Sequence, residues 1–368
     1  MAEAATDRPG VEPGLGAQPL ELDEHIKGVS LWKDAWRRLS KNKLAMIGLV
    51  LVVLYAIVSL AAPILPIPSY KDQVIDHQYL PPSITKSAGE LMYARQEFLL
   101  TAYAEKEERE LNTAEVERLS DLRDRIENEM VVVDGKEKKL HDRIYLLGTD
   151  SLGRDLLARI IYGGQVSIAI GLIGTITSVL IGIVLGALAG YIGGNVDYII
   201  MRIVDIMYGL PYMMLVIIFM AMFGRSIMNL FFALAIVSWL TVARVVRGQI
   251  ISLKNSEFIE AARSIGANTG RIVFRHLVPN TLGVIVVFST LRIPTFIMLE
   301  AFLSFLGLGV QAPFASWGSL VGDGVDGMNL YPWLLFFPAV AMVLFLFSMN
   351  FLGDGLRDAL DPQSKNRL

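Results

Sequence analysis

The chain has 368 residues, of which 53% are hydrophobic and 19% are charged, and its mean hydropathy is +0.49. This composition indicates a membrane-embedded protein rather than an ordinary soluble domain. The formal net charge of −3 averages over unlike regions and says little about partners, and we expect no nucleic-acid partner. Cysteine is absent, which excludes disulfides, thiol catalysis and cysteine-ligated metal sites. The four histidines lie outside the apolar segments and leave little material for a histidine-based active site.

Residues 1–29 are predicted to form a disordered cytoplasmic tail. They lack an apolar core, and they lack the basic start and apolar stretch of a secretory signal. Residues 30–69 are predicted to hold an interfacial helix and a first transmembrane span. In that helix Trp32 and Trp36 recur at helical spacing among basic residues, a pattern typical of the headgroup layer. The alternative, that the helix only begins the first span, is compatible with this interpretation.

Six apolar segments predict six transmembrane helices, at 44–62, 166–189, 197–224, 230–246, 282–308 and 332–352. The first is uncharged, and at ~1.5 Å per residue it covers ~30 Å of hydrocarbon. The short segments on one side of the spans are rich in Lys and Arg, whereas the short loops on the other side hold only Arg225. The positive-inside rule then makes both termini cytoplasmic. We therefore expect an all-α protein of the cytoplasmic (inner) membrane, with a polar, helical extracytoplasmic insertion after the first span.

That insertion comprises residues 70–147. Two helices are expected, at 91–112 and 113–130, the second opened by a capping box of Asn112 and Glu115. The two helices would pair as an antiparallel hairpin through apolar side chains, which are Leu91, Phe98, Leu99 and Ala102 on the first and Val116, Leu119, Leu122, Ile126 and Met130 on the second. A β-turn is expected around residues 131–136. The insertion could dock a partner protein or roof an outer vestibule; the alternative is a purely structural addition.

Residues 148–353 are expected to form a five-span core with a cytoplasmic loop at 255–280, and 354–368 a cytoplasmic tail. A helix capped by Asp150 or Ser151 leads into the second span. Arg202 is expected to pair with Asp205, and Pro294 to break the fifth span. Small residues in the second span would let neighbouring helices approach closely; they are Gly171, Gly174, Gly182 and Gly186.

The loop at 257–280 is the longest polar stretch in the second half of the chain. Residues 256–265 have helix-forming composition, with apolar Phe258, Ile259, Ala262 and Ile265 on one side. Gly266 is expected to end this helix, and Thr269 to cap a second short one. Such a helical elbow between two spans would present a rigid knob to the aqueous phase. The alternative is an ordinary loop with a solvated charged face.

No catalytic or nucleotide-binding pattern is present. The sequence lacks a GxxxxGK[ST] phosphate loop, HExxH and CxxC, and no histidine lies at membrane depth for a serine–histidine pair. We therefore expect neither enzyme activity nor a metal or other cofactor. Transport or channel function remains by elimination.

The loop resembles the coupling loop of binding-protein-dependent ABC transporter permeases. The pattern of that family is matched by Glu260, Ala261, Ala262, Gly266 and Pro279, with Val278 where leucine is usual. Four further blocks resemble the dipeptide/oligopeptide/nickel branch, specifically its second permease subunit: LGTDSLGRDLLARIIYGG, GYIGGNVDYIIMRIVDIMYGLP, EAFLSFLGLGVQAPFASWGSLVGDG and FLGDGLRDALDP. The insertion is longer than expected for this family.

The resemblance implies a permease subunit of an ATP-driven importer, most simply for di- or oligopeptides, with nickel chelates or another small solute as alternatives. Its partners would be a second permease, two ATPase subunits, an extracytoplasmic solute-binding protein and the lipid bilayer. The ATPase-coupling residues would be Glu257, Glu260, Ala261, Ala262, Arg263, Gly266 and Pro279.

Three acidic residues near the outer half suit a peptide's amino end, namely Glu300, Asp323 and Asp326. The alternative is that Glu300 pairs with another helix and the aspartates cap turns. Two further function classes stay open: a secondary transporter, and a membrane scaffold that acts through the outer insertion.

Overall fold

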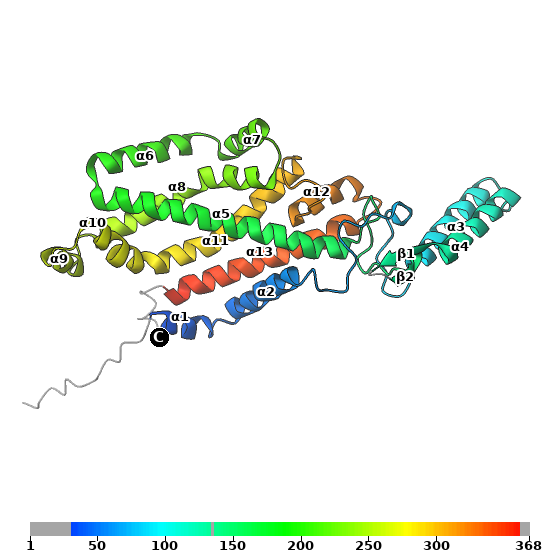
Figure 1. Cartoon of the computed structure of the whole chain (residues 1–368), viewed down its shortest axis with the longest axis horizontal. Coiled ribbons are helices and arrows are strands. Elements are labelled where there is room, and N and C mark those ends of the chain that lie inside the picture. The colour runs from blue at the N-terminus through cyan, green and yellow to red at the C-terminus, as the bar shows by residue number, and fades with distance from the viewer. Residues whose placement is uncertain (1–30, 134–135, 361–368) are drawn as a thin grey trace, which may run out of the picture.

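The computed structural model describes residues 31–133 and 136–360. The predicted tail at 1–29, the turn residues 134–135 and the end of the C-terminal tail lie outside these ranges. The described part is almost entirely helical, with one two-stranded hairpin. Long helices run side by side as a bundle, a helical hairpin projects from one end, and the short helix α9 (Glu257–Ser264) projects from the other (Figure 1).

Five described helices are long and apolar enough to cross a membrane, or six if one bent pair forms a single span. They are α2 (Lys43–Leu60), α5 (Leu156–Ile192), α8 (Ile227–Leu253), α11 (Val278–Phe305) and α13 (Trp333–Leu360), with α6 (Gly194–Gly209) and α7 (Tyr212–Phe223) as the bent pair. The prediction of an all-helical membrane protein is confirmed. The orientation of the termini remains a prediction from the charge distribution.

The predicted third span is broken into α6 and α7, which meet at 86°. Pro211 stands at the N-terminal cap of α7 and lacks an amide hydrogen for a continuous helix. Leu210 before it is extended, with φ −94° and ψ 141°, because proline disfavours helical geometry in the preceding residue. The predicted break at Pro294, in contrast, is wrong. Helix α11 continues through this buried proline, where packing by neighbouring helices supports the backbone.

Glycines allow α5 to lie directly against α8 and α11. A Cβ atom at Gly182 would lie 2.5 Å from Cβ of Val242, and one at Gly186 would lie 2.5 Å from the carbonyl oxygen of Ala243. Gly171 and Gly174 face α11 in the same way, close to Ile293 and Phe296. Without a hydrophobic driving force in lipid, helices associate through such close packing, so the predicted role of these glycines is confirmed.

Helix α1 (Leu31–Leu39) is amphipathic and lies beside α13. Ala35 and Leu39 are buried in a cluster with Leu352, whereas Trp32 and Trp36 are more than half exposed. Tryptophan side chains on the outer face fit the predicted headgroup position. Asn42 then caps α2 by accepting a hydrogen bond from the amide of Ala45, so the interfacial helix and the first span are separate elements.

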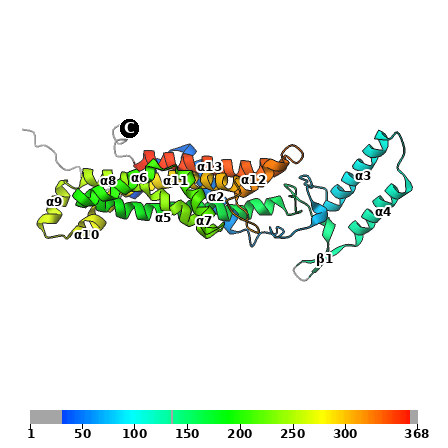
Figure 2. The ribbon, with the colours of Figure 1, turned by 90° about the horizontal axis from the view of Figure 1, so that it is seen from above.

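The insertion begins with the short 3-10 helix η1 (Ile75–His77) and rises as the hairpin of α3 (Ala88–Lys106) and α4 (Thr113–Asn128), which Figure 2 shows projecting beyond the bundle. The predicted capping box of Asn112 and Glu115 is confirmed. The expected facing of Phe98 and Leu99 toward α4 is wrong, because their side chains are 70% and 55% exposed. Strands β1 (Met130–Val133) and β2 (Lys136–Lys139) pair antiparallel, with Met130 opposite Lys139, and lead into the 3-10 helix η2 (Leu140–Asp142).

Two further predictions about local structure need correction. Helix α5 starts at Leu156 and is capped by Asp155, not by Asp150 or Ser151. Arg202 does not pair with Asp205; its guanidinium contacts the hydroxyl of Tyr198, and Asp205 instead pairs with Arg244 across to α8. Tertiary packing brings a stronger partner to Asp205 than the residue three positions earlier.

Candidate functional site

Residues 257–280, predicted from the sequence to be a coupling loop, form a compact elbow at the end of the bundle opposite the insertion (Figure 1). Helix α9 ends as predicted at Gly266, whose φ of +82° favours glycine. The amide of Gly266 donates to the carbonyl of Arg263, and the amide of Ala267 donates to that of Ala262. These two bonds form a Schellman motif, which fixes the direction of the chain after the helix.

The return from the elbow leads directly into α11. Asn268, not the expected Thr269, caps the next turn by accepting a bond from the amide of Arg271. The single turn α10 (Thr269–Arg271) continues as a π-helical stretch, η3 (Ile272–Leu277), into α11. Pro279 lies just after η3, and Leu277 before it keeps helical geometry, with φ −76° and ψ −55°. The elbow is therefore continuous with a membrane helix.

One side of α9 is anchored in the core of the chain. Ile259 is fully buried and Ala262 is 4% exposed, and both pack in a cluster with Val246 and Ile250 of α8. Arg263 donates to the carbonyl of Lys254 and lies over the ring of Tyr191. One buried cluster therefore joins α9 to residues of α8 and of α11.

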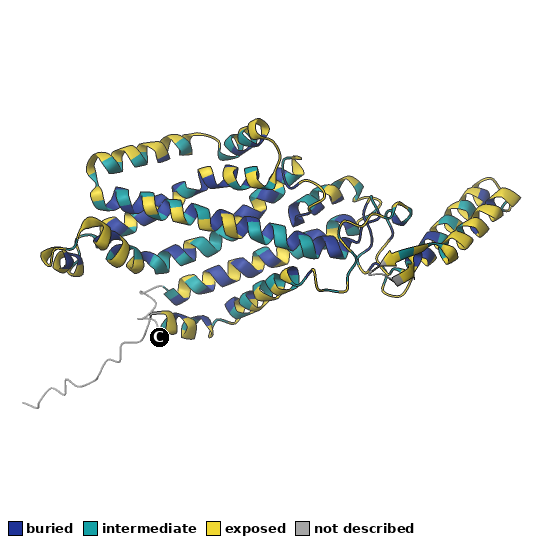
Figure 3. Cartoon of the chain, viewed as in Figure 1, coloured by how far each residue is buried: buried dark blue, intermediate teal, exposed yellow. Residues whose placement is uncertain are grey.

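The opposite side of α9 is open, as Figure 3 shows by its exposed colouring. Ile265 is 86% exposed and Phe258 is 42% exposed, so the predicted single apolar side is divided between the core and the surface. Glu257, Glu260 and Ala261 are exposed as well. Of the two alanines in the motif, only Ala261 is accessible to a partner, because Ala262 is covered by the chain itself. An apolar tip rimmed by charges is typical of a protein-binding surface.

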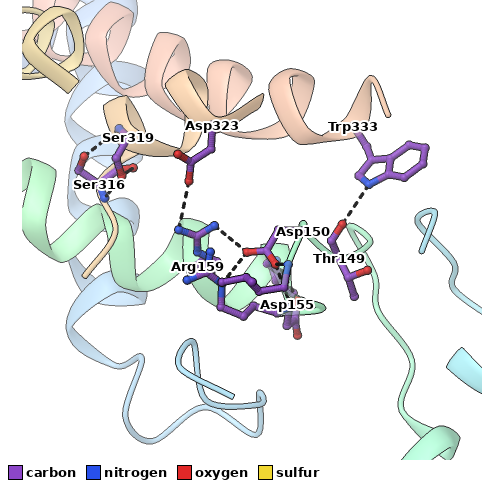
Figure 4. Close-up of polar contacts among 11 residues, drawn as sticks. Thr149, Asp150, Asp155, Arg159, Ser316, Ser319, Asp323 and Trp333 are labelled. Atoms are coloured by element: carbon purple, nitrogen blue, oxygen red, sulfur yellow. Dashed lines mark hydrogen bonds and ion pairs between the residues drawn. The ribbon is translucent and has the colours of Figure 1, made fainter. Parts of the chain in front are cut away.

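A cavity of about 780 Å³ lies at the insertion end of the bundle, lined by α12 (Trp317–Gly327) and the start of α5. Its polar wall is an ion-pair network, shown in Figure 4. Arg159 donates to Asp150 at 2.7 Å and contacts Asp323 at 3.4 Å, and Arg154 donates to the same Asp150 oxygen at 2.7 Å. Asp155, the cap of α5, is buried next to this network, and burial raises the pKa of its carboxyl to about 6.

The three acidic residues singled out from the sequence separate into two groups. Asp323 and Asp326 are exposed and line this cavity, and both lie inside α12 instead of capping turns. Glu300 is fully buried below α12, where one oxygen accepts bonds from Ser304 and Ser316 at 2.6 Å each. Ser316 is the cap of α12, so Glu300 positions the helix that carries the two aspartates. The buried position and the bond to the cap of α12 favour the alternative interpretation of Glu300, a contact with another helix, over a place on the substrate pathway.

A buried histidine pair at the base of the insertion was missed by the sequence analysis. His77 bonds the hydroxyl of Tyr145 through Nδ1 and His141 through Nε2, both at 2.8 Å, and His141 bonds Glu129 at 2.9 Å. Burial, followed by the charges of neighbouring groups, lowers the pKa of His77 to about 3. Burial likewise raises the pKa of Tyr145 to about 12. The two histidines lie 64 positions apart, so no local spacing indicates their contact.

Asp76, Glu129 and His141 also place ligand atoms within 4.8 Å of one another, a possible cation site. The Arg125 guanidinium lies 2.5 Å from Asp76 and 4.0 Å from Glu129. It already balances the two carboxylates, so we interpret the cluster as a structural tie between η1, α4 and η2.

Comparison with known proteins identifies two family matches. Residues 182–366 match the binding-protein-dependent transport system inner membrane component, and residues 30–82 match the N-terminal TM domain of oligopeptide transport permease C. The oligopeptide transport system permease protein OppC of Escherichia coli (strain K12) is 39% identical over 340 residues, which cover 92% of this chain and 94% of that protein. OppC and the dipeptide transport system permease protein DppC of Bacillus subtilis (strain 168) are each 37% identical, covering 92% and 91% of this chain and 91% and 87% of their own lengths.

Proposed function

The chain belongs to the family of binding-protein-dependent transport system inner membrane components, and from that premise we propose that it is one permease subunit of an ATP-driven importer of di- or oligopeptides. It is a multi-pass inner-membrane permease, which is a transport component rather than a catalytic one. The peptide cargo is supported by the names of the relatives, which are oligopeptide and dipeptide transport permeases.

The observation that carries this proposal is the anchored elbow with an exposed apolar tip. In the proposed assembly two ATPase subunits bind the cytoplasmic ends of this chain and of a second permease subunit. Ile265 and Phe258 would enter an apolar groove on the ATPase, Ala261 would permit close approach, and Glu257 and Glu260 would contact its rim.

The contacts of α9 with the rest of the chain would couple the ATPase to the membrane helices. Because Ile259 packs against α8 and the elbow continues into α11, an ATPase that changes conformation would move α9, α8 and α11 together. Such rigid-body movement of packed helices is a general route to alternating access. A solute-binding protein would deliver cargo at the insertion end, where Asp323 and Asp326 offer carboxylates to a peptide's amino group.

Substitution of Gly266 tests the coupling role. Valine is β-branched and disfavours a φ of +82°, at a cost of roughly 1–2 kcal/mol, whereas asparagine tolerates this region. A Cβ atom here would meet no atom within 4 Å, so the strain of the substitution lies in the backbone of the Schellman turn. We expect Gly266→Val to insert normally in the membrane but to lose peptide uptake, and Gly266→Asn to retain most of it.

The measurement is uptake of a labelled tripeptide into proteoliposomes that contain the purified complex, with co-purification of the two ATPases and the second permease. Equal uptake by the valine and asparagine variants would contradict the coupling role. Uptake by this chain alone, without ATPase subunits, would refute the importer assignment and favour a secondary transporter.

A further inference from the structure

Polar side chains of the bent pair, α8 and α11 contact one another within otherwise apolar helices. We call it the polar seam, defined by Tyr208, Tyr212, Ser238, Thr241, Arg244 and Arg292. The hydroxyls of Tyr208 and Thr241 lie 2.7 Å apart, and those of Tyr212 and Ser238 lie 3.3 Å apart. Positions 238, 241 and 244 are three residues apart and share one face of α8.

Two residues of the seam are partly exposed in this chain. Tyr208 is 45% exposed, and the side chain of Arg244 is 45% exposed beside its partner Asp205. Helices α6 and α7, which meet at 86°, both contact α8. Polar and ionisable groups within membrane helices commonly mark a solute path.

Arg292 is the residue of the seam that lies on α11. It lies near the middle of α11, about 20 Å from either end of that helix at 1.5 Å per residue. Its Nη2 donates to the carbonyl of Ser238 at 2.7 Å, its guanidinium lies 5.6 Å from the ring centre of Phe296, and its Nε is buried without a hydrogen-bond partner.

Two arginines of α8 have acidic partners. Arg244 pairs with Asp205, and Arg247 pairs with Asp197. Within residues 31–133 and 136–360, Arg292 contacts no carboxylate. A cation at membrane depth with no counter-charge is costly, so it points to a ligand that supplies the negative charge. A guanidinium suits a carboxylate in particular, because its planar fork can donate two parallel bonds.

We propose that the polar seam is part of the solute path through this subunit and that Arg292 binds the solute's carboxylate, which in a peptide is the C-terminal one. This inference rests on the proposed function and names the group that the path recognises. Arg292 would be a specificity-determining residue. Its single carbonyl contact leaves other donors for the ligand, and one charged contact is weak enough to release the solute onward.

The test compares uptake of trialanine and of trialanine amide, which lacks the C-terminal charge, into proteoliposomes with one fixed solute-binding protein. The variants are Arg292→Gln, which removes the charge, and Arg292→Lys, which keeps it. Arg202→Gln is the matched control, because Arg202 is an exposed arginine of α6 whose polar contact among the described residues is with Tyr198. Since the binding protein is the same in every assay, a changed ratio between the two peptides belongs to the permease.

We expect wild type to prefer trialanine, and Arg292→Gln to lower its uptake about tenfold while uptake of the amide changes less than twofold. Arg292→Lys should keep most of the preference, and Arg202→Gln all of it. An equal loss for both peptides in Arg292→Gln would show a structural or partner contact and overturn the inference, as would an unchanged ratio or a wild type without preference. Absence of uptake of either peptide by wild type would refute the proposed function itself.

Discussion

Truncation of Ile265 to alanine should weaken ATPase binding without affecting the fold. The side chain is 86% exposed, so its removal changes the stability of the chain by no more than about 0.5 kcal/mol. If the ATPase buries it, the lost methyl and methylene groups, at ~0.8 kcal/mol each, weaken association by about 2 kcal/mol. At 1.4 kcal/mol per tenfold, this is roughly a thirtyfold loss of affinity.

The assay titrates purified ATPase subunits onto proteoliposomes that hold the two permeases, and measures the concentration that gives half-maximal ATP hydrolysis. Ile84→Ala is the matched control, because Ile84 is 82% exposed but lies in the insertion at the opposite end of the molecule. The reasoning fails if Ile265→Ala leaves the half-maximal concentration unchanged, or if Ile84→Ala shifts it equally.

Two further predictions concern stability. Gly182→Ala places a Cβ atom 2.5 Å from Cβ of Val242 and should lower the free energy of unfolding by about 1–3 kcal/mol. In the control Gly248→Ala the new Cβ atom meets nothing within 4 Å, so this variant should be neutral or slightly stabilising. Equal thermal midpoints of the two variants in detergent would contradict this prediction. The pKa of His77 falls from 6.5 to about 3 in the folded insertion, so its contribution is complete above pH 6.5 and is lost as the pH falls toward 3. Protease cleavage within 70–147 should therefore rise in acid, and His77→Phe should flatten that rise; an unchanged pH profile in the variant would count against it.

Much of the membrane core was predictable because its signals are local in sequence. An apolar helix long enough to span hydrocarbon is defined by composition alone, so five spans match described helices. The end of α9 at Gly266 and the capping box at Asn112 were predictable for the same reason, since each depends on residues at most five positions apart.

The errors arose where a residue's partner comes from a distant element. Asp205 was assigned to Arg202 on helical spacing, but packing of α6 on α8 brings Arg244 to it. Phe258 and Ile259 could not be separated into a surface and a core residue until the direction of α9 against α8 was known.

The sequence by itself determined the class of this protein: its apolar segments, its coupling motif and its lack of any nucleotide-binding loop. Only the tertiary structure showed that Ile265 faces outward and Ala262 inward, that Glu300 supports α12, and that Arg292 has no carboxylate within the described chain. The physical reason is that the burial of a side chain and the pairing of its charge depend on how two helices pack against each other. Helical periodicity places a side chain on its own helix, but only the packing of helices decides which group meets it.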